Sequence, residues 1–140
     1  MDQELKREII MDNYLNPKNK ETVLDSSYEK VNSNNDSCID NIDIYVKINN
    51  DIIEDIKFDG EACAISTSST SIMINNLIGK SVKDALDYIN NFDNMVNEKE
   101  YDEDVLNEAI VYNDIYKQNN RKHCALLPYI GIKKILEKHL

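Results

Sequence analysis

Basic residues and long apolar runs are both scarce in this sequence of 140 residues. The chain has 16 lysines and arginines against 26 aspartates and glutamates, which gives a net charge of −10 at pH 7. This charge argues against nucleic acid and anionic membranes as partners, because both would repel the protein. No apolar run approaches the roughly 20 residues that span a bilayer, and Met1 to Glu4 show no signal-peptide pattern. We therefore expect a soluble cytoplasmic protein with no nucleic-acid or membrane partner.

Cysteine and histidine are also few, with three and two copies, and tryptophan is absent. An odd number of cysteines in a reducing compartment argues against a disulfide framework and favours metal binding or catalysis. Three cysteines cannot complete a tetrahedral zinc site, so a fourth ligand must come from histidine, aspartate or glutamate. The length predicts one domain, residues 1–140.

The first half of the chain predicts one helix and a small antiparallel sheet. A helical pattern over 2–15 stops at Asn16-Pro17. Residues 26–31 form a possible short edge strand, followed by a loop over 32–37. Apolar residues then alternate with polar ones over 42–48 and 52–58, which predicts a hairpin with an Asn-rich turn and one apolar face. Helices should cover that face.

The second half predicts four helices, so the fold class is α+β with about three strands. The first helix follows Cys63 and ends before Gly79, a residue typical of a C-cap. The next begins at the capping box Ser81 to Asp84. An acidic connector over 93–104 and a shorter helix follow. The last helix should begin close to Cys124, because Pro128 is best tolerated in a first turn.

Four residues of this pattern are candidate metal ligands: Cys38, Asp40, Cys63 and Cys124. Residues i and i+2 of an extended segment share a face, so Cys38 and Asp40 can reach one ion. The predicted hairpin brings its outer ends together, which places Asp40 beside Cys63. Cys63 itself lies at a strand-to-helix corner, where free N–H groups and the helix dipole stabilise a thiolate. With Cys124 the set becomes three sulfurs and one oxygen, which suits zinc.

Two alternatives remain open on the residues alone. Three buried and inert cysteines are a common outcome, and the long separations are not those of a zinc finger. His123, which directly precedes Cys124, could replace or supplement a ligand or could be a surface residue. The hydroxyl run 66–71 has no nearby base, and we interpret it as helix capping and close packing of small side chains.

The motifs around the cysteines resemble those of the SufU/IscU family of iron–sulfur cluster assembly proteins, also called NifU-like N-terminal domains. They are the opening Leu5 to Asn19 with its Asn16-Pro17 stop, Asn35-Asp36-Ser37-Cys38-Ile39-Asp40, Phe58-x-Gly60-x-Ala62-Cys63-Ala64-Ile65-Ser66, and Arg121-x-x-Cys124-Ala125-x-Leu127. The separation of 61 positions from Cys63 to Cys124 is similar to the longer SufU spacing. His123 is instead the residue that IscU proteins have at this place.

The resemblance implies a zinc-containing sulfur acceptor that works with a SufS-like, pyridoxal-phosphate-dependent cysteine desulfurase and passes sulfur toward downstream cluster assembly or acceptor proteins. It implies metal ligation by Cys38, Asp40, Cys63 and Cys124, support from Arg121, and sulfur acceptance by Cys38 on its loop. The alternative is a scaffold that carries a transient [2Fe–2S] cluster on the same residues.

The sequence departs from the family motifs at three places. Asp36 replaces a proline, and Ile39 and Ala62 replace glycines that allow turn conformations. These changes bear on the shape of the Cys38 loop and not on the presence of the ligands.

Overall fold

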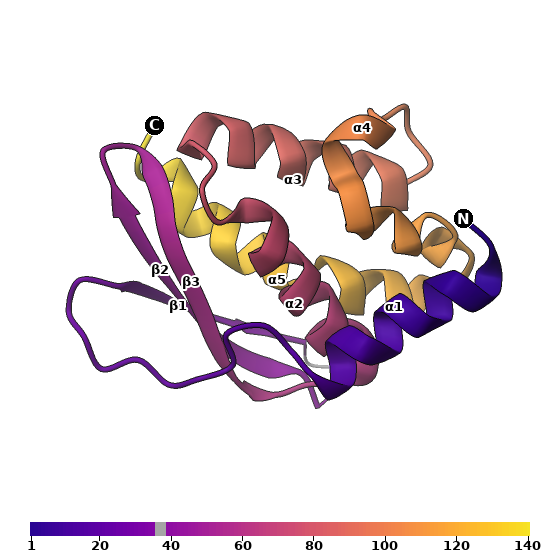
Figure 1. The fold of residues 1–140 in the computed structure, drawn as a ribbon, viewed down its shortest axis with the longest axis horizontal. Helices are drawn as coiled ribbons and strands as arrows, with labels where there is room; N and C mark the ends of the chain where they lie inside the picture. The colour runs from indigo at the N-terminus through magenta and orange to yellow at the C-terminus, as the bar shows by residue number, and fades with distance from the viewer. Residues whose placement is uncertain (36–38) are drawn as a thin grey trace.

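The computed structural model describes residues 1–35 and 39–140 (Figure 1). Asp36, Ser37 and Cys38 lie outside the described residues. In chain order the elements are α1 (Gln3–Leu15), β1 (Glu29–Asn34), β2 (Asn41–Asn49), β3 (Ile52–Glu61), α2 (Ala64–Leu77), α3 (Val82–Val96), α4 (Glu103–Leu106), the 3₁₀ helices η1 (Asn107–Tyr112) and η2 (Ile115–Lys117), and α5 (Asn119–Glu137).

The three strands form one antiparallel sheet in the order β1-β2-β3. Ile44 in the central strand pairs with Val31 on one side and Phe58 on the other. The hairpin turn places Asn50 and Asp51 at positive φ, the geometry of the tight turns that match strand twist. The predicted hairpin and the α+β class are confirmed.

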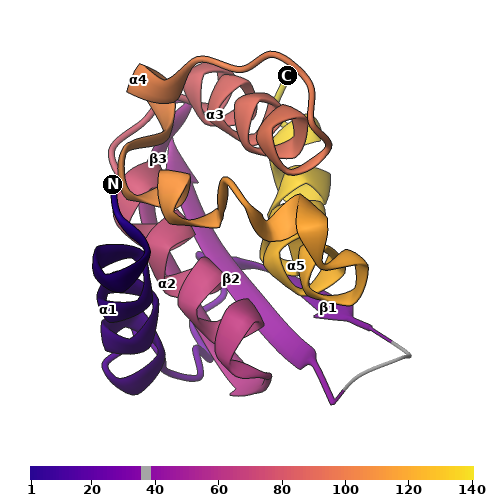
Figure 2. The same cartoon turned by 90° about the vertical axis from the view of Figure 1, so that its right-hand side faces the viewer.

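The helices pack on one face of the sheet, as the alternating pattern predicts (Figure 1). Alternate residues of β2 and β3, such as Ile42, Ile44 and Ile56, are completely buried in the core. α2 lies between α1 and α5 (Figure 2), so its side chains meet helices on both flanks. This arrangement places the N-terminal end of α2 next to the end of the sheet where β2 begins and β3 ends.

The boundaries of two elements differ from the sequence prediction. β1 covers residues 29–34, so residues 32–34, which were predicted to begin a loop over 32–37, belong to the strand. α3 continues to Val96 and buries Met95 and Val96, so the solvated connector is shorter than the expected 93–104. β1 is extended by its pairing with β2, and α3 by packing against the core, each into a segment whose polar composition suggests a loop.

The last helix is also longer than predicted. α5 begins at Asn119, which the sequence suggests as a break, and Pro128 lies inside the helix and not in its first turn. Cys124 therefore lies more than a turn inside α5. An internal proline leaves the carbonyl four residues earlier, here that of Cys124, without its helical donor.

The helical pattern over 2–15 rests on apolar residues, and α1 packs two of them, Ile9 and Ile10, against the core. The same helix also buries polar side chains. Lys6 is only 7% exposed, whereas Leu5 is 44% exposed, and Asn13 is buried while Tyr14 is not. Lys6 Nζ donates to Asn113 Oδ1 at 2.6 Å and to Asp114 Oδ2 at 3.0 Å. α1 is therefore held both by apolar packing and by specific hydrogen bonds to polar partners. No helix of the described residues is both long and apolar enough to cross a membrane.

Candidate metal centre

Cys63 lies at the corner between β3 and α2, as predicted. It is the N-cap of α2, with an extended backbone at φ −69° and ψ 171°. Its Sγ accepts the backbone N–H of Ser66 at 3.5 Å, and the side chain is half-buried. The sulfur therefore lies at the end of a helix where unpaired N–H groups favour negative charge.

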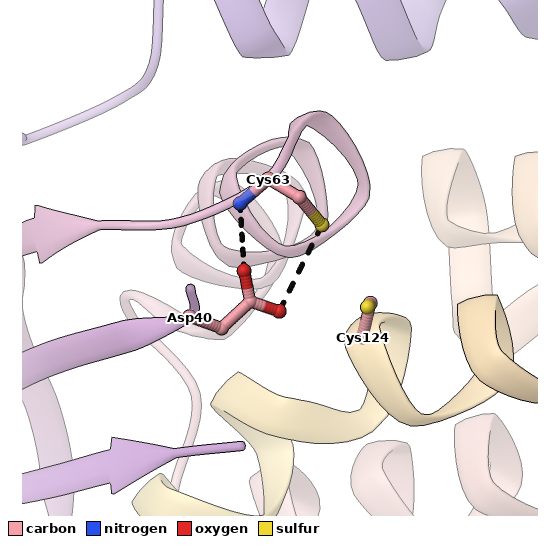
Figure 3. Close-up of side chains that lie close together, drawn as sticks. All are labelled: Asp40, Cys63 and Cys124. Atoms are coloured by element: carbon pink, nitrogen blue, oxygen red, sulfur yellow. Dashed lines mark hydrogen bonds between the residues drawn. The ribbon is translucent and has the colours of Figure 1, made fainter. Parts of the chain in front are cut away.

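Asp40 lies directly before β2 and is held against Cys63. The carboxyl group is 1% exposed, and its Oδ1 accepts the backbone N–H of Cys63 at 2.7 Å (Figure 3). Its Oδ2 accepts from the Cys63 thiol at an Oδ2–Sγ distance of 3.7 Å. The outer ends of the hairpin thus meet as the sequence predicts.

Gly60 permits this close approach of β2 and β3. It has a φ of +123°, a region that favours glycine, and a Cβ built on it would lie 2.3 Å from the backbone oxygen of Asn41. Since Asn41 follows Asp40 directly, a side chain at position 60 would displace the segment that carries the carboxylate.

Cys124, which lies on α5, is the third member of a cluster with Asp40 and Cys63. One ligand atom each from Asp40, Cys63 and Cys124 lies within 4.8 Å of the other two. Figure 3 shows the Cys124 thiol directed toward the other two side chains. Burial, with contributions from Cys63 and Asp40, raises the pKa of the Cys124 thiol to about 12. This thiol is therefore protonated at neutral pH unless a cation favours its thiolate.

The donor set and its spacing fit a zinc ion. Zinc binds thiolates at about 2.3 Å and carboxylate oxygens at about 2.0–2.2 Å in tetrahedral sites. Two sulfurs on one such ion lie roughly 3.8 Å apart. The present separations, within 4.8 Å, need only a small contraction to reach this geometry. Three convergent ligands leave one tetrahedral position for a fourth donor.

The remaining predicted site residues lie elsewhere. Cys38, the proposed fourth ligand, lies outside the described residues, so its role stays a prediction. His123 is exposed and is not part of the cluster found among the residues that the structure describes. Arg121 is exposed one turn before Cys124 on α5, and its supporting role also remains a prediction.

Sequence reasoning missed the part that Ser66 plays. The hydroxyl run 66–71 is completely or almost completely buried, as the packing interpretation requires. Ser66, however, also contacts the cluster, because its Oγ donates to Asp40 Oδ2 at 2.5 Å. The available signal was its spacing: the third residue after an N-cap points back toward the cap.

The chain matches the family model of the NifU-like N terminal domain over residues 5–125. The chain belongs to this family. It is 38% identical over 135 residues to the zinc-dependent sulfurtransferase SufU of Bacillus subtilis strain 168. This match covers 96% of this chain and 90% of the relative. It is 31% identical over 131 residues to the iron–sulfur cluster assembly scaffold protein IscU of Thermotoga maritima, covering 94% of this chain and 92% of that protein.

A solved structure supports the same assignment. The crystal structure of a putative iron–sulfur cluster assembly scaffold protein for the SUF system, from Fervidobacterium islandicum AW-1, superposes with a TM-score of 0.84 at 37% identity. The match covers 94% of this chain and 93% of that one. The family resemblance drawn from the motifs is therefore confirmed.

Proposed function

We propose that this protein is a zinc-dependent sulfurtransferase that accepts persulfide sulfur from a SufS-like cysteine desulfurase for iron–sulfur cluster assembly. The observation that carries the proposal is the convergence of Asp40, Cys63 and Cys124 within 4.8 Å. The similarity along 96% of the chain to a protein named as a zinc-dependent sulfurtransferase supports it. A reducing compartment such as the cytoplasm suits this activity, because thiol chemistry requires reduced cysteines.

In this proposal, Asp40, Cys63, Cys124 and Cys38 hold the metal. Zinc stabilises thiolates and has no redox activity of its own. Asp40 is oriented by the Cys63 N–H, and Cys63 by the end of α2, so two of the ligands are positioned by backbone groups. Burial of Cys124 keeps bulk water from its sulfur.

The sulfur acceptor in this proposal is Cys38. Because Cys38 would also be a metal ligand, its thiolate would have to be released before it reacts, leaving Asp40, Cys63 and Cys124 to keep the metal. The free thiolate then attacks the terminal sulfur of the persulfide on the desulfurase. A new S–S bond forms on Cys38, the S–S bond of the desulfurase breaks, and the electron pair leaves on the desulfurase thiolate. That thiolate, once freed, can accept sulfur from another cysteine substrate, so the desulfurase turns over. The pyridoxal phosphate stays with the desulfurase.

The decisive experiment measures alanine production by a cysteine desulfurase with and without the zinc-loaded protein. We expect marked stimulation, and mass spectrometry should show one added sulfur atom on the acceptor. Cys38→Ser should abolish both results. A Cys38→Ser protein that still accepts sulfur at the normal rate would refute the assignment of Cys38, and no stimulation by the wild-type protein would refute the sulfurtransferase.

The alternative function is a scaffold for a transient [2Fe–2S] cluster on the same residues. The similarity to proteins named as IscU scaffolds favours it, including one from Streptococcus pyogenes serotype M1 at 37% identity over 111 residues. Reconstitution with iron and sulfide separates the two functions. A scaffold should develop iron-dependent visible absorbance and transfer its cluster to an apo-protein, whereas a zinc sulfurtransferase should not.

A further inference from the structure

Ser66 has more acceptors within reach than its single hydroxyl proton can serve. Its side chain is 0% exposed, and its Oγ lies 2.5 Å from Asp40 Oδ2 and 3.0 Å from the backbone oxygen of Cys124. The Cys63 Sγ lies 3.7 Å from the same Oγ. Ser66 is thus in contact with all three described members of the metal centre. A hydroxyl has one donor, so it cannot satisfy both oxygens fully at once.

The Cys124 carbonyl competes for this proton because of Pro128. In a regular helix the N–H of residue 128 would donate to the oxygen of Cys124, but proline has no N–H. The Ser66 hydroxyl, which comes from α2, lies within hydrogen-bond distance of this oxygen and can donate to it. The internal proline of α5 therefore couples the helix that carries Cys124 to the residue that contacts Asp40.

We propose that Ser66 is a positioning residue of the metal centre, whose hydroxyl directs Asp40 Oδ2 toward the two thiols and shares its proton with the Cys124 carbonyl. The proposal rests on the metal centre of the proposed function. Ligand-orienting hydrogen bonds of this kind change metal affinity because they fix the ligand before the metal binds. Ser66 does not ligate the metal and does not take part in sulfur transfer.

Ser69 provides a matched control on the same helix. It lies about one turn further along α2, is also 0% exposed, and donates to the Ala125 carbonyl of α5 at 2.7 Å. Ser69 therefore joins α2 to α5 as Ser66 does, and the structure records no contact between Ser69 and Asp40 among the described residues. If Ser66 only joined the two helices, Ser66→Ala and Ser69→Ala would behave alike.

The experiment measures zinc affinity by chelator competition and the visible spectrum of the cobalt-substituted protein, together with the thermal stability of the metal-free form. We expect Ser66→Ala to weaken zinc binding by about 10- to 100-fold and to alter the cobalt spectrum. Ser69→Ala should leave affinity within about twofold and the spectrum unchanged. Both should lower metal-free stability by similar amounts. Equal zinc affinities of the two variants would overturn the proposal.

A second variant keeps the test valid if Ser66→Ala does not fold. Pro128→Ala restores an N–H for the Cys124 carbonyl and leaves the Ser66 hydroxyl to Asp40 alone. Zinc binding should tighten by about two- to tenfold, the range that one hydrogen bond contributes. An unchanged affinity would overturn the sharing of the proton.

The outcomes also separate this proposal from the proposed function. If wild-type protein binds zinc but Ser66→Ala binds it equally well, only the role of Ser66 falls. If wild-type protein binds no zinc, both fall. A third outcome is that the wild-type protein binds zinc and Ser66→Ala weakens this binding, but the desulfurase is not stimulated. That result would support the role of Ser66 and refute the sulfurtransferase function.

Discussion

The metal centre has two arms that are built in different ways. The sheet arm, Asp40 and Cys63, is held by hydrogen bonds from backbone N–H groups at the end of a hairpin and at a helix N-cap. The helix arm, Cys124, lies inside α5 and is held by packing, with 3% of its surface exposed. The comparison teaches that one residue type can become a ligand by two routes: local backbone geometry for Cys63 and tertiary packing for Cys124.

Replacing each cysteine with serine gives the largest expected effect and separates the two arms. Cys63→Ser and Cys124→Ser should each weaken zinc binding more than about 100-fold, beyond the loss of an outer-shell partner. The two variants should differ in the folding stability of their metal-free forms. Serine is a preferred N-cap, so Cys63→Ser should keep or raise stability. Cys124→Ser buries a hydroxyl and should cost about 1 kcal/mol or more.

Chelator competition and denaturant unfolding of the metal-free proteins measure these two effects. A Cys63→Ser protein that loses as much metal-free stability as Cys124→Ser would show that the two arms are not built differently.

Substitution of Gly60 should disturb the sheet arm alone. Gly60→Ala meets the Asn41 backbone at 2.3 Å and adopts a φ of +123°, so it combines a steric clash with backbone strain. Gly79 is the control, because it also has a positive φ, +91°, but no atom lies within 4 Å of an added Cβ. We expect Gly79→Ala to cost about 1 kcal/mol and Gly60→Ala to cost about 3 kcal/mol or more, since strain alone costs about 1–3 kcal/mol.

The same pair should differ in metal binding. Gly60→Ala should also weaken zinc binding, because it displaces the segment of Asp40, whereas Gly79→Ala should not. Urea denaturation and zinc titration test this prediction, and equal costs with equal zinc affinities would contradict it.

The smallest expected effect concerns the protons of the helix arm. Because burial raises the pKa of Cys124 to about 12, its thiol is protonated at neutral pH and must lose its proton when zinc binds. This step makes affinity rise with pH by about tenfold per unit for each proton released. Calorimetric titration in buffers of different ionisation enthalpy counts these protons. On binding zinc, the Cys124→Ser protein should release about one proton fewer than the wild-type protein. An equal number of released protons would show that Cys124 was already ionised.

Much of the sheet arm could be predicted from the sequence. The alternating runs over 42–48 and 52–58 specify a hairpin, and its outer ends must meet, which places Asp40 beside Cys63. The change from strand to helix around Cys63 specifies the N-cap. These signals are local: strand period, turn residues and capping depend on neighbours in the chain, so they can be interpreted without the fold.

The tertiary structure decided the helix arm and its connections. Proline propensity places Pro128 in a first turn, but in the fold α5 tolerates it internally, where Ser66 supplies a donor to the carbonyl it leaves free. Lys6 is buried for a similar reason, because Asn113 and Asp114 lie opposite it. The sequence by itself determined which residues can be ligands and where the hairpin and the N-cap form. Only the packing of distant helices decided which hydroxyl, carbonyl and charge meet, because such pairs lie far apart along the chain.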